Sequence, residues 1–166
     1  MTEPSLPPET IAFSGKIGEV VHAVQPDGRI FERYRRPPGT RIVLVSPKKE
    51  ILITREHRLE SGNIDLRLPG GKVRDSLAEY HDLLDSGQDL TEAAKTAAIK
   101  EALEETGLIV KNLKLIIKVN AGATVDWDLY YFMVTDYEAS PDGQQLEHGE
   151  DIEVTWTTTT DIRKDV

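Results

Sequence analysis

Residues 92–108 read EAAKTAAIKEALEETGL and form the most regular stretch of the sequence. Alanine dominates this stretch, and glutamate, lysine and leucine fill much of the rest, a composition that favours an α-helix. Thr91-Glu92 is typical of a helix N-terminus, and Gly107 is typical of the residue that ends a helix. The sequence therefore predicts one long helix from Thr91 to Gly107.

Three glutamates crowd the C-terminal end of this predicted helix. Glu101 lies three residues before Glu104 and four before Glu105, so the three carboxylates share one face. Like charges at this spacing destabilise an isolated helix, and the helix dipole disfavours anions at this end. A divalent cation would neutralise the cluster, and carboxylate oxygens suit Mg²⁺ or Mn²⁺. A solvated acidic helix face is the alternative that this segment leaves open.

A glycine pair precedes the helix. A short strand at residues 66–68 leads into Pro69-Gly70-Gly71-Lys72. Two glycines allow a tight turn and expose a backbone carbonyl to a ligand, although a glycine pair alone is most often only a turn. The spacing does not fit a Walker-type phosphate loop, because no Gly-Lys-Ser/Thr follows.

The rest of the chain alternates strands with helical segments. Residues 1–10 are proline-rich and polar, and we expect them to be disordered. Two strands are expected within residues 13–36, with their turn at residues 25–28. Further elements are expected as a strand pair resembling a hairpin at 41–45 and 51–54, a short helix at 76–86, and strands at 113–119, 129–135 and 152–156. This pattern predicts an α/β or α+β fold, in one domain over residues 11–166.

Composition excludes several classes of protein. The 166 residues are 39% hydrophobic and 30% charged, and no apolar run is long enough to span a membrane. The absence of cysteine excludes disulfides, thiolate zinc sites and a cysteine nucleophile. The first ten residues do not resemble a secretory signal, so a cytoplasmic location is expected.

Charge is unevenly distributed along the chain. The net charge of −9 argues against nonspecific nucleic-acid binding. Residues 1–74 hold 13 Lys and Arg against 9 Asp and Glu, a net of +4, whereas residues 75–166 carry a net of −13. A basic half and an acidic half suit a site where arginines hold an anion and carboxylates hold a cation, although charge alone favours a solvated acidic surface.

The helix and the glycine loop together resemble the Nudix hydrolase family. The family signature is Gly, five residues, Glu, seven residues, Arg-Glu, an apolar residue, any residue, Glu-Glu, any residue, Gly and an apolar residue. This chain has Glu92, then seven residues, then Lys100-Glu101, Ala102-Leu103, Glu104-Glu105, Thr106 and Gly107-Leu108. Residues 13–39 are similar to the N-terminal strands of the ADP-ribose pyrophosphatase branch, and residues 150–154 to its late acidic loop. The resemblance implies an α/β fold: a Nudix-like α/β/α sandwich with a mixed β-sheet and an N-terminal antiparallel strand pair.

For activity, the resemblance implies hydrolysis that depends on Mg²⁺ or Mn²⁺. The substrate would be a nucleoside diphosphate linked to another moiety, such as ADP-ribose or a similar nucleotide sugar, and the products a nucleoside monophosphate and a phosphorylated compound. The implied metal ligands are the carbonyl of Gly70 and the carboxylates of Glu101, Glu104 and Glu105. A further carboxylate would accept a proton from the attacking water or complete the metal shell. Glu150 is the first candidate for it and Glu147 the second.

The substrate-binding candidates lie outside the helix. Arg36 and Arg58 are candidates for holding phosphate, because arginine binds it bidentately. Asp126, or Asp128, occupies the place of an acidic substrate-side residue in this branch, and Trp127 either stacks on a base or belongs to the core. The branch also implies a homodimer. Two other functions stay open: a non-catalytic Nudix-like module that binds a nucleotide, and cleavage of a nucleoside triphosphate.

Two departures from the signature stand out. Twenty residues separate Gly71 from Glu92 where the family has five, unless Gly87-Gln88 is the matching pair and the extra residues lie in the helix. This insertion is expected either to form a partial lid, with Tyr80, Leu83 and Leu84 pointing inward, or to be a solvated excursion. The second departure is Lys100, which keeps the charge of the family's arginine but loses its fork.

Overall fold

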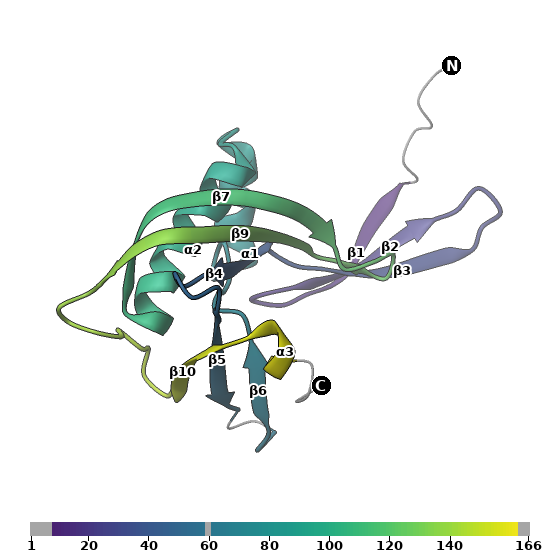
Figure 1. Cartoon of the computed structure of the whole chain (residues 1–166). Helices are drawn as coiled ribbons and strands as arrows, with labels where there is room; N and C mark the ends of the chain where they lie inside the picture. The colour runs from purple at the N-terminus through teal and green to yellow at the C-terminus, as the bar shows by residue number, and fades with distance from the viewer. Residues whose placement is uncertain (1–7, 59–60, 163–166) are drawn as a thin grey trace.

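The computed structural model describes residues 8–58 and 61–162. The chain forms three β-sheets and three helices within these residues (Figure 1). The elements are β1 (Glu9–Ser14), β2 (Glu19–Val24), β3 (Ile30–Arg35), β4 (Gly39–Leu44), β5 (Ile51–His57), β6 (Ile64–Arg67), α1 (Leu77–Asp85), α2 (Leu90–Thr106), β7 (Leu108–Asn120), β8 (Val125–Asp126), β9 (Asp128–Ala139), β10 (Ile152–Thr157) and α3 (Thr159–Ile162).

The central sheet is mixed, as expected. Its order is β4-β9-β7, with β4 parallel to β9 and β9 antiparallel to β7. Helix α2 packs on this sheet and lies behind β7 and β9 in Figure 1. The core between them joins small alanines of the helix, such as Ala94 and Ala98, to large sheet residues such as Ile42 and Phe132. The mixed α/β fold predicted from the sequence is therefore confirmed.

The N-terminal strands form a separate sheet that extends to one side of the central sheet (Figure 1). The expected antiparallel pair is β2–β3, and β1 adds a third antiparallel strand while β8 adds a parallel one. Because β1 begins at Glu9, the end of the segment expected to be disordered belongs to a strand instead. Residues 1–7 lie outside the described residues.

The hairpin expected from residues 41–45 and 51–54 is wrong. β4 pairs with β9, whereas β5 lies in a third sheet of order β10-β5-β6. Only one isolated bridge, between Val45 and Ile51, joins the two segments, and the Val45 N–H donates to the Val134 carbonyl at 2.9 Å. The segments are adjacent in sequence, but long-range pairing with later strands outcompetes the local hairpin.

The long helix begins one residue earlier than predicted. Asp89 is its N-cap, and its carboxylate accepts the N–H groups of Thr91 and Glu92 at 2.6 and 3.3 Å. Gly107 ends the helix as predicted, with a left-handed φ of 69°. Glu92 lies in the first turn of α2, and Glu101, Glu104 and Glu105 lie in its last turns.

The insertion folds onto the body of the protein. The Leu77 N–H, at the start of α1, donates to the Lys16 carbonyl of the β1–β2 turn at 2.8 Å. Leu83 is buried and Tyr80 packs against the core, but Leu84 is 46% exposed, so its predicted inward contact is wrong. None of the described helices is long and apolar enough to cross a membrane.

Candidate active site

The carboxylates at the end of α2 face a cavity of about 520 Å³. Eight of the nine residues predicted as site residues line it: Arg36, Arg58, Gly70, Glu101, Glu104, Glu105, Glu147 and Glu150. The ninth, Asp126, is not among the lining residues; its carboxylate accepts from the Asn120 amide at 3.3 Å. From the insertion, only Lys72 and Asp75 reach this cavity, so α1 does not form the predicted lid.

The glycine loop brings the backbone against α2. Gly70 has φ of +138°, which L side chains rarely adopt, and a Cβ there would collide with the Thr40 carbonyl. A Cβ on Gly71 would collide with the carboxylate of Glu101. Gly70 is thus needed for the loop to lie against β4, whereas a side chain at Gly71 would displace the carboxylate of Glu101.

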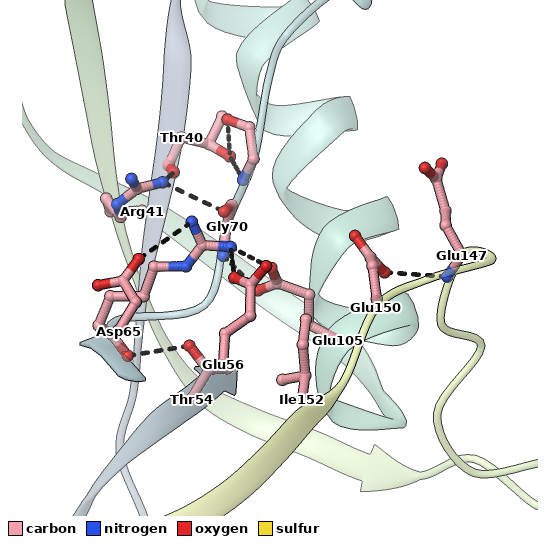
Figure 2. Close-up of polar contacts among 12 residues, drawn as sticks. Thr40, Arg41, Thr54, Glu56, Asp65, Gly70, Glu105, Glu147, Glu150 and Ile152 are labelled. Atoms are coloured by element: carbon pink, nitrogen blue, oxygen red, sulfur yellow. Dashed lines mark hydrogen bonds and ion pairs between the residues drawn. The ribbon is translucent and has the colours of Figure 1, made fainter. Parts of the chain in front are cut away.

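Glu105 is held at both of its oxygens (Figure 2). It is 3% exposed; Oε2 accepts the Gly70 N–H at 2.7 Å, and Oε1 accepts from Arg67 Nη2 at 3.0 Å. Burial raises the pKa of this carboxyl, while the Gly70 N–H and the Arg67 guanidinium oppose the rise. The two contacts fix the orientation of a carboxylate that burial alone would penalise.

Glu101 is the carboxylate that lacks such support. Within the part of the chain that the structure describes, no hydrogen bond or ion pair reaches its side chain. Burial, followed by the negative charge of Glu105, raises the pKa of Glu101 to about 7. This carboxylate would be relieved by a cation at the cavity.

Glu104 has a different partner. Its Oε2 accepts from Lys100 Nζ at 2.7 Å, four residues earlier on the same helix. This bond raises the pKa of the Lys100 ammonium. The Lys100 that replaces the family's arginine therefore pairs with one glutamate through a single point charge.

The two predicted arginines differ in their surroundings. The Arg36 guanidinium lies 4.6 Å above the Trp127 ring and has no ion-pair partner among the described residues. The Nε1 of Trp127 is buried without a hydrogen-bond partner, and its ring lines the cavity. Arg58 is instead bound to Glu56 at 2.7 Å and to Asp65 at 3.0 Å.

Sequence reasoning missed several charged residues that line the same cavity, among them Arg41, Glu56, Asp65 and Arg67. Arg41 Nη1 donates to the Gly70 carbonyl, the predicted metal ligand, at 3.1 Å (Figure 2). Burial, followed by the charge of Arg67, lowers the pKa of Arg41. Asp65 and Arg67 are two residues apart on β6, so strand alternation was the available signal that they share a face.

The late acidic loop reaches the cavity before β10. The Glu147 N–H donates to Glu150 Oε2 at 2.9 Å, and Figure 2 shows Glu150 beside α2 with Glu147 farther along the loop. The charge of Glu150 contributes to the raised pKa of both Glu101 and Glu105. Glu150 is therefore electrostatically coupled to both helix carboxylates.

The oxygen ligands at the cavity are of the kind that a hard divalent cation binds, but their side chains are not gathered into a preformed metal site among the described residues. Among residues 8–58 and 61–162, no three His, Cys, Asp or Glu side chains converge closely enough to form a metal site. The available donors are carboxylate and carbonyl oxygens, the ligands that Mg²⁺ and Mn²⁺ prefer, and Glu101 is a half-buried carboxylate among them whose pKa is raised.

Comparison with known proteins gives the family. The NUDIX domain description matches residues 35–166, most of the chain, so the protein belongs to the Nudix family. The β1–β3 region lies almost wholly before this match.

Solved structures share the fold. One, titled crystal structure of ADP compounds hydrolase, is 18% identical with a TM-score of 0.58, and the match covers 98% of this chain and 84% of that one. Another comes from a study of MutT from the fish pathogen Aliivibrio salmonicida and from Vibrio cholerae. It is 19% identical with a TM-score of 0.53, over 78% of this chain and 85% of that one. No curated protein sequence matches significantly.

The raised pKa of Glu101 predicts a specific pH dependence of stability. The folded pKa of about 7 lies above the usual glutamate pKa of 4.5, so the folded state binds this proton more tightly than the unfolded state. The stabilisation is complete below pH 4.5 and is lost as the pH rises through 7. This loss amounts to up to roughly 3 kcal/mol in the free energy of unfolding, and we expect Glu101→Gln to abolish it.

The measurement is urea unfolding in EDTA at several pH values between 5 and 8. Thr96→Ala, a non-titrating change on the same helix, is the control and should keep the wild-type slope against pH. Parallel curves for Glu101→Gln and wild type would show that the carboxylate is not buried against Glu105.

Proposed function

We propose that this Nudix protein is a metal-dependent hydrolase of a nucleoside diphosphate linked to another moiety, such as ADP-ribose or a similar nucleotide sugar. The observation that carries the proposal is that the α2 carboxylates and the cationic Arg36 line one cavity. The products are a nucleoside monophosphate and a phosphorylated compound. The similarity in fold to an ADP compounds hydrolase and to MutT supports hydrolysis of a nucleotide. We place this activity in the cytoplasm.

The metal ligands that we propose are Glu101, Glu104, Glu105 and the Gly70 carbonyl. When bound there, Mg²⁺ or Mn²⁺ supplies positive charge against the diphosphate and lowers the pKa of water. Glu105 is already oriented by the Gly70 N–H and by Arg67. Glu101 lines the cavity so close to Gly71 that a side chain there would meet its carboxylate, and among the described residues no cation forms an ion pair with it.

Arg36 is the residue that we propose to bind the diphosphate. Stacking on Trp127 fixes the plane of its guanidinium while leaving its N–H groups without an ion-pair partner among the described residues. A planar, oriented guanidinium binds phosphate oxygens bidentately at little further entropic cost. Arg58 is the weaker candidate, because it must leave Glu56 or Asp65 to reach an anion.

Glu150 is the proposed proton acceptor for the attacking water. Its Oε2 is occupied by the Glu147 N–H, and this bond fixes the carboxylate beside the α2 glutamates. Glu147 lines the cavity as well, but the main causes of the raised pKa of Glu101 and of Glu105 include the charge of Glu150 and not that of Glu147. The coupling favours Glu150 over Glu147.

A substrate panel tests the proposed activity. Purified protein is incubated with ADP-ribose, other nucleotide sugars and nucleoside triphosphates, with Mg²⁺ and with Mn²⁺, and products are resolved by chromatography. We expect nucleoside monophosphate from the diphosphate compounds and, for Glu101→Gln, a loss of roughly two orders of magnitude or more in kcat. Binding without turnover of any compound would instead identify a non-catalytic nucleotide-binding module.

The choice between the two loop glutamates is tested by paired substitutions. We expect Glu150→Gln to lower kcat by roughly 100-fold or more, in the range of general-base catalysis, and Glu147→Gln to lower it far less. Each variant is assayed at saturating substrate, with the circular dichroism spectrum as the folding control. An equal or larger loss for Glu147→Gln would reverse the assignment.

We also propose that the chain forms a homodimer through its N-terminal sheet. β1 exposes Ile11 and Phe13 at 58% and 63%, and β3 exposes Ile30, so this sheet presents apolar side chains to solvent. Light scattering after gel filtration should give twice the mass of one chain. Phe13→Glu should give the monomer, whereas Ile116→Glu, on the distant strand β7, should not. A monomeric wild type contradicts the proposal.

A further inference from the structure

One guanidinium joins two buried carboxylates that come from different parts of the fold. Arg67 Nη2, at the end of β6, lies 2.9 Å from Glu56 Oε2 on β5 and 3.0 Å from Glu105 Oε1 on α2. Glu56 and Glu105 are only 7% and 3% exposed. Figure 2 shows their carboxylates pointing toward one another. Arg67 therefore lies where two negative charges would otherwise meet away from water.

Arg67 is itself fixed in place. Its backbone carbonyl accepts from Thr54 Oγ1 at 3.1 Å, and Asp65 lies 3.9 Å from its Nη1. Glu56 is held on its other oxygen by Arg58 Nη1 at 2.7 Å. The chain of contacts from Arg58 through Glu56 to Arg67 ends on Glu105, so the strands β5 and β6 set the position of a helix carboxylate.

The lysine beside the glutamates does not make this contact. Lys100 Nζ binds Glu104, and its side chain is 59% exposed. Among the contacts in the described part of the chain, Lys100 has none with Glu105 or Glu56, whereas Arg67 Nη2 reaches both. Of the cations among the described residues, Arg67 is the one with an ion pair to Glu105.

We propose that Arg67 is a positioning residue of the active site. It holds Glu105 Oε1 while the Gly70 N–H holds Oε2, and so fixes the carboxylate in the orientation that binds the divalent cation. The role rests on the proposed function, because it assigns Glu105 to the metal. It goes beyond that function because the residue that orients this metal ligand lies on β6, outside the helix motif.

The competing explanation is that Arg67 only neutralises charge. The two explanations predict opposite effects on metal affinity. If Arg67 is a counter-charge, removing it makes the cavity more negative and strengthens binding of a cation. If Arg67 positions Glu105, removing it frees the carboxylate to rotate and weakens binding, since loss of a residue that orients a metal ligand typically costs 10–100-fold in affinity.

The experiment measures Mn²⁺ affinity without substrate. Titration calorimetry on wild type, Arg67→Gln and Arg67→Lys, at one pH and ionic strength, gives the dissociation constants. We expect Arg67→Gln to bind Mn²⁺ at least about 10-fold more weakly, and Arg67→Lys to recover part of the loss through its charge. Equal or tighter binding by Arg67→Gln overturns the proposal, and so does a wild type that does not bind Mn²⁺.

Arg55→Gln is the matched control. It removes an arginine and an ion pair, to Glu153, from the same sheet without touching the cavity. Its Mn²⁺ affinity should equal that of the wild type; an equal loss in both variants would show a nonspecific effect of changing this sheet and overturn the proposal. If Arg67→Gln does not fold, Arg67→Lys alone decides, because a weaker Mn²⁺ affinity despite the retained charge cannot come from the loss of a counter-charge.

Kinetics provide the second measurement. With the best substrate, a positioning role lowers kcat in Arg67→Gln and leaves KM within a few-fold. A rise in KM with kcat unchanged would assign Arg67 to substrate binding and overturn the proposal. If the wild type binds Mn²⁺ in an Arg67-dependent way but hydrolyses nothing in the panel, the positioning role stands and only the proposed activity fails.

Discussion

The buried carboxylate of Glu105 is the point on which the site depends. A carboxylate removed from water is costly unless it is hydrogen-bonded and paired, and here a backbone N–H and a guanidinium meet both needs. The N–H comes from Gly70 and the guanidinium from β6, so a single side chain ties α2 to the glycine loop and to the third sheet. The fold keeps this charge buried only because these three segments meet at one place.

The uneven charge along the chain becomes an ordered arrangement in space. Strands β4 and β6 and the residue after β5 supply Arg41, Arg67 and Arg58 from the basic first half, and α2 with the late loop supplies glutamates from the acidic second half. Most of these arginines are already committed to carboxylates or carbonyls. Arg36 differs, because an aromatic ring rather than an anion supports it. Arg36 is therefore the arginine that we propose to meet a substrate anion, while the other three are paired with groups of the protein.

The part of this site that follows the helix motif could be predicted from sequence. The period of a helix is enough to place Glu101, Glu104 and Glu105 together, and the glycine pair is enough to place a backbone turn before them. Glu56 and Arg67 could not be found in this way, because their link to Glu105 spans 38 residues or more and depends on how β5 and β6 pair. The same limit explains the mistaken hairpin: local spacing cannot reveal that β4 pairs with β9 and β5 with β10.

The structure of the insertion between Gly71 and Glu92 explains how the chain accommodates these added residues next to the site. The added segment leaves the glycine loop at Lys72, anchors the start of α1 on the β1–β2 turn and buries Leu77 and Leu83. It returns through Gly87, whose φ of 68° permits the reversal, to the N-cap Asp89. The entropic cost of closing a loop grows only logarithmically with its length. The burial of two leucines and the capped helix α1 therefore offset much of this cost. Because α1 begins against the β1–β2 turn and none of its residues lines the cavity, the added residues link the N-terminal sheet to the helix that carries the carboxylates, while Gly70 and Glu105 remain in hydrogen-bond contact.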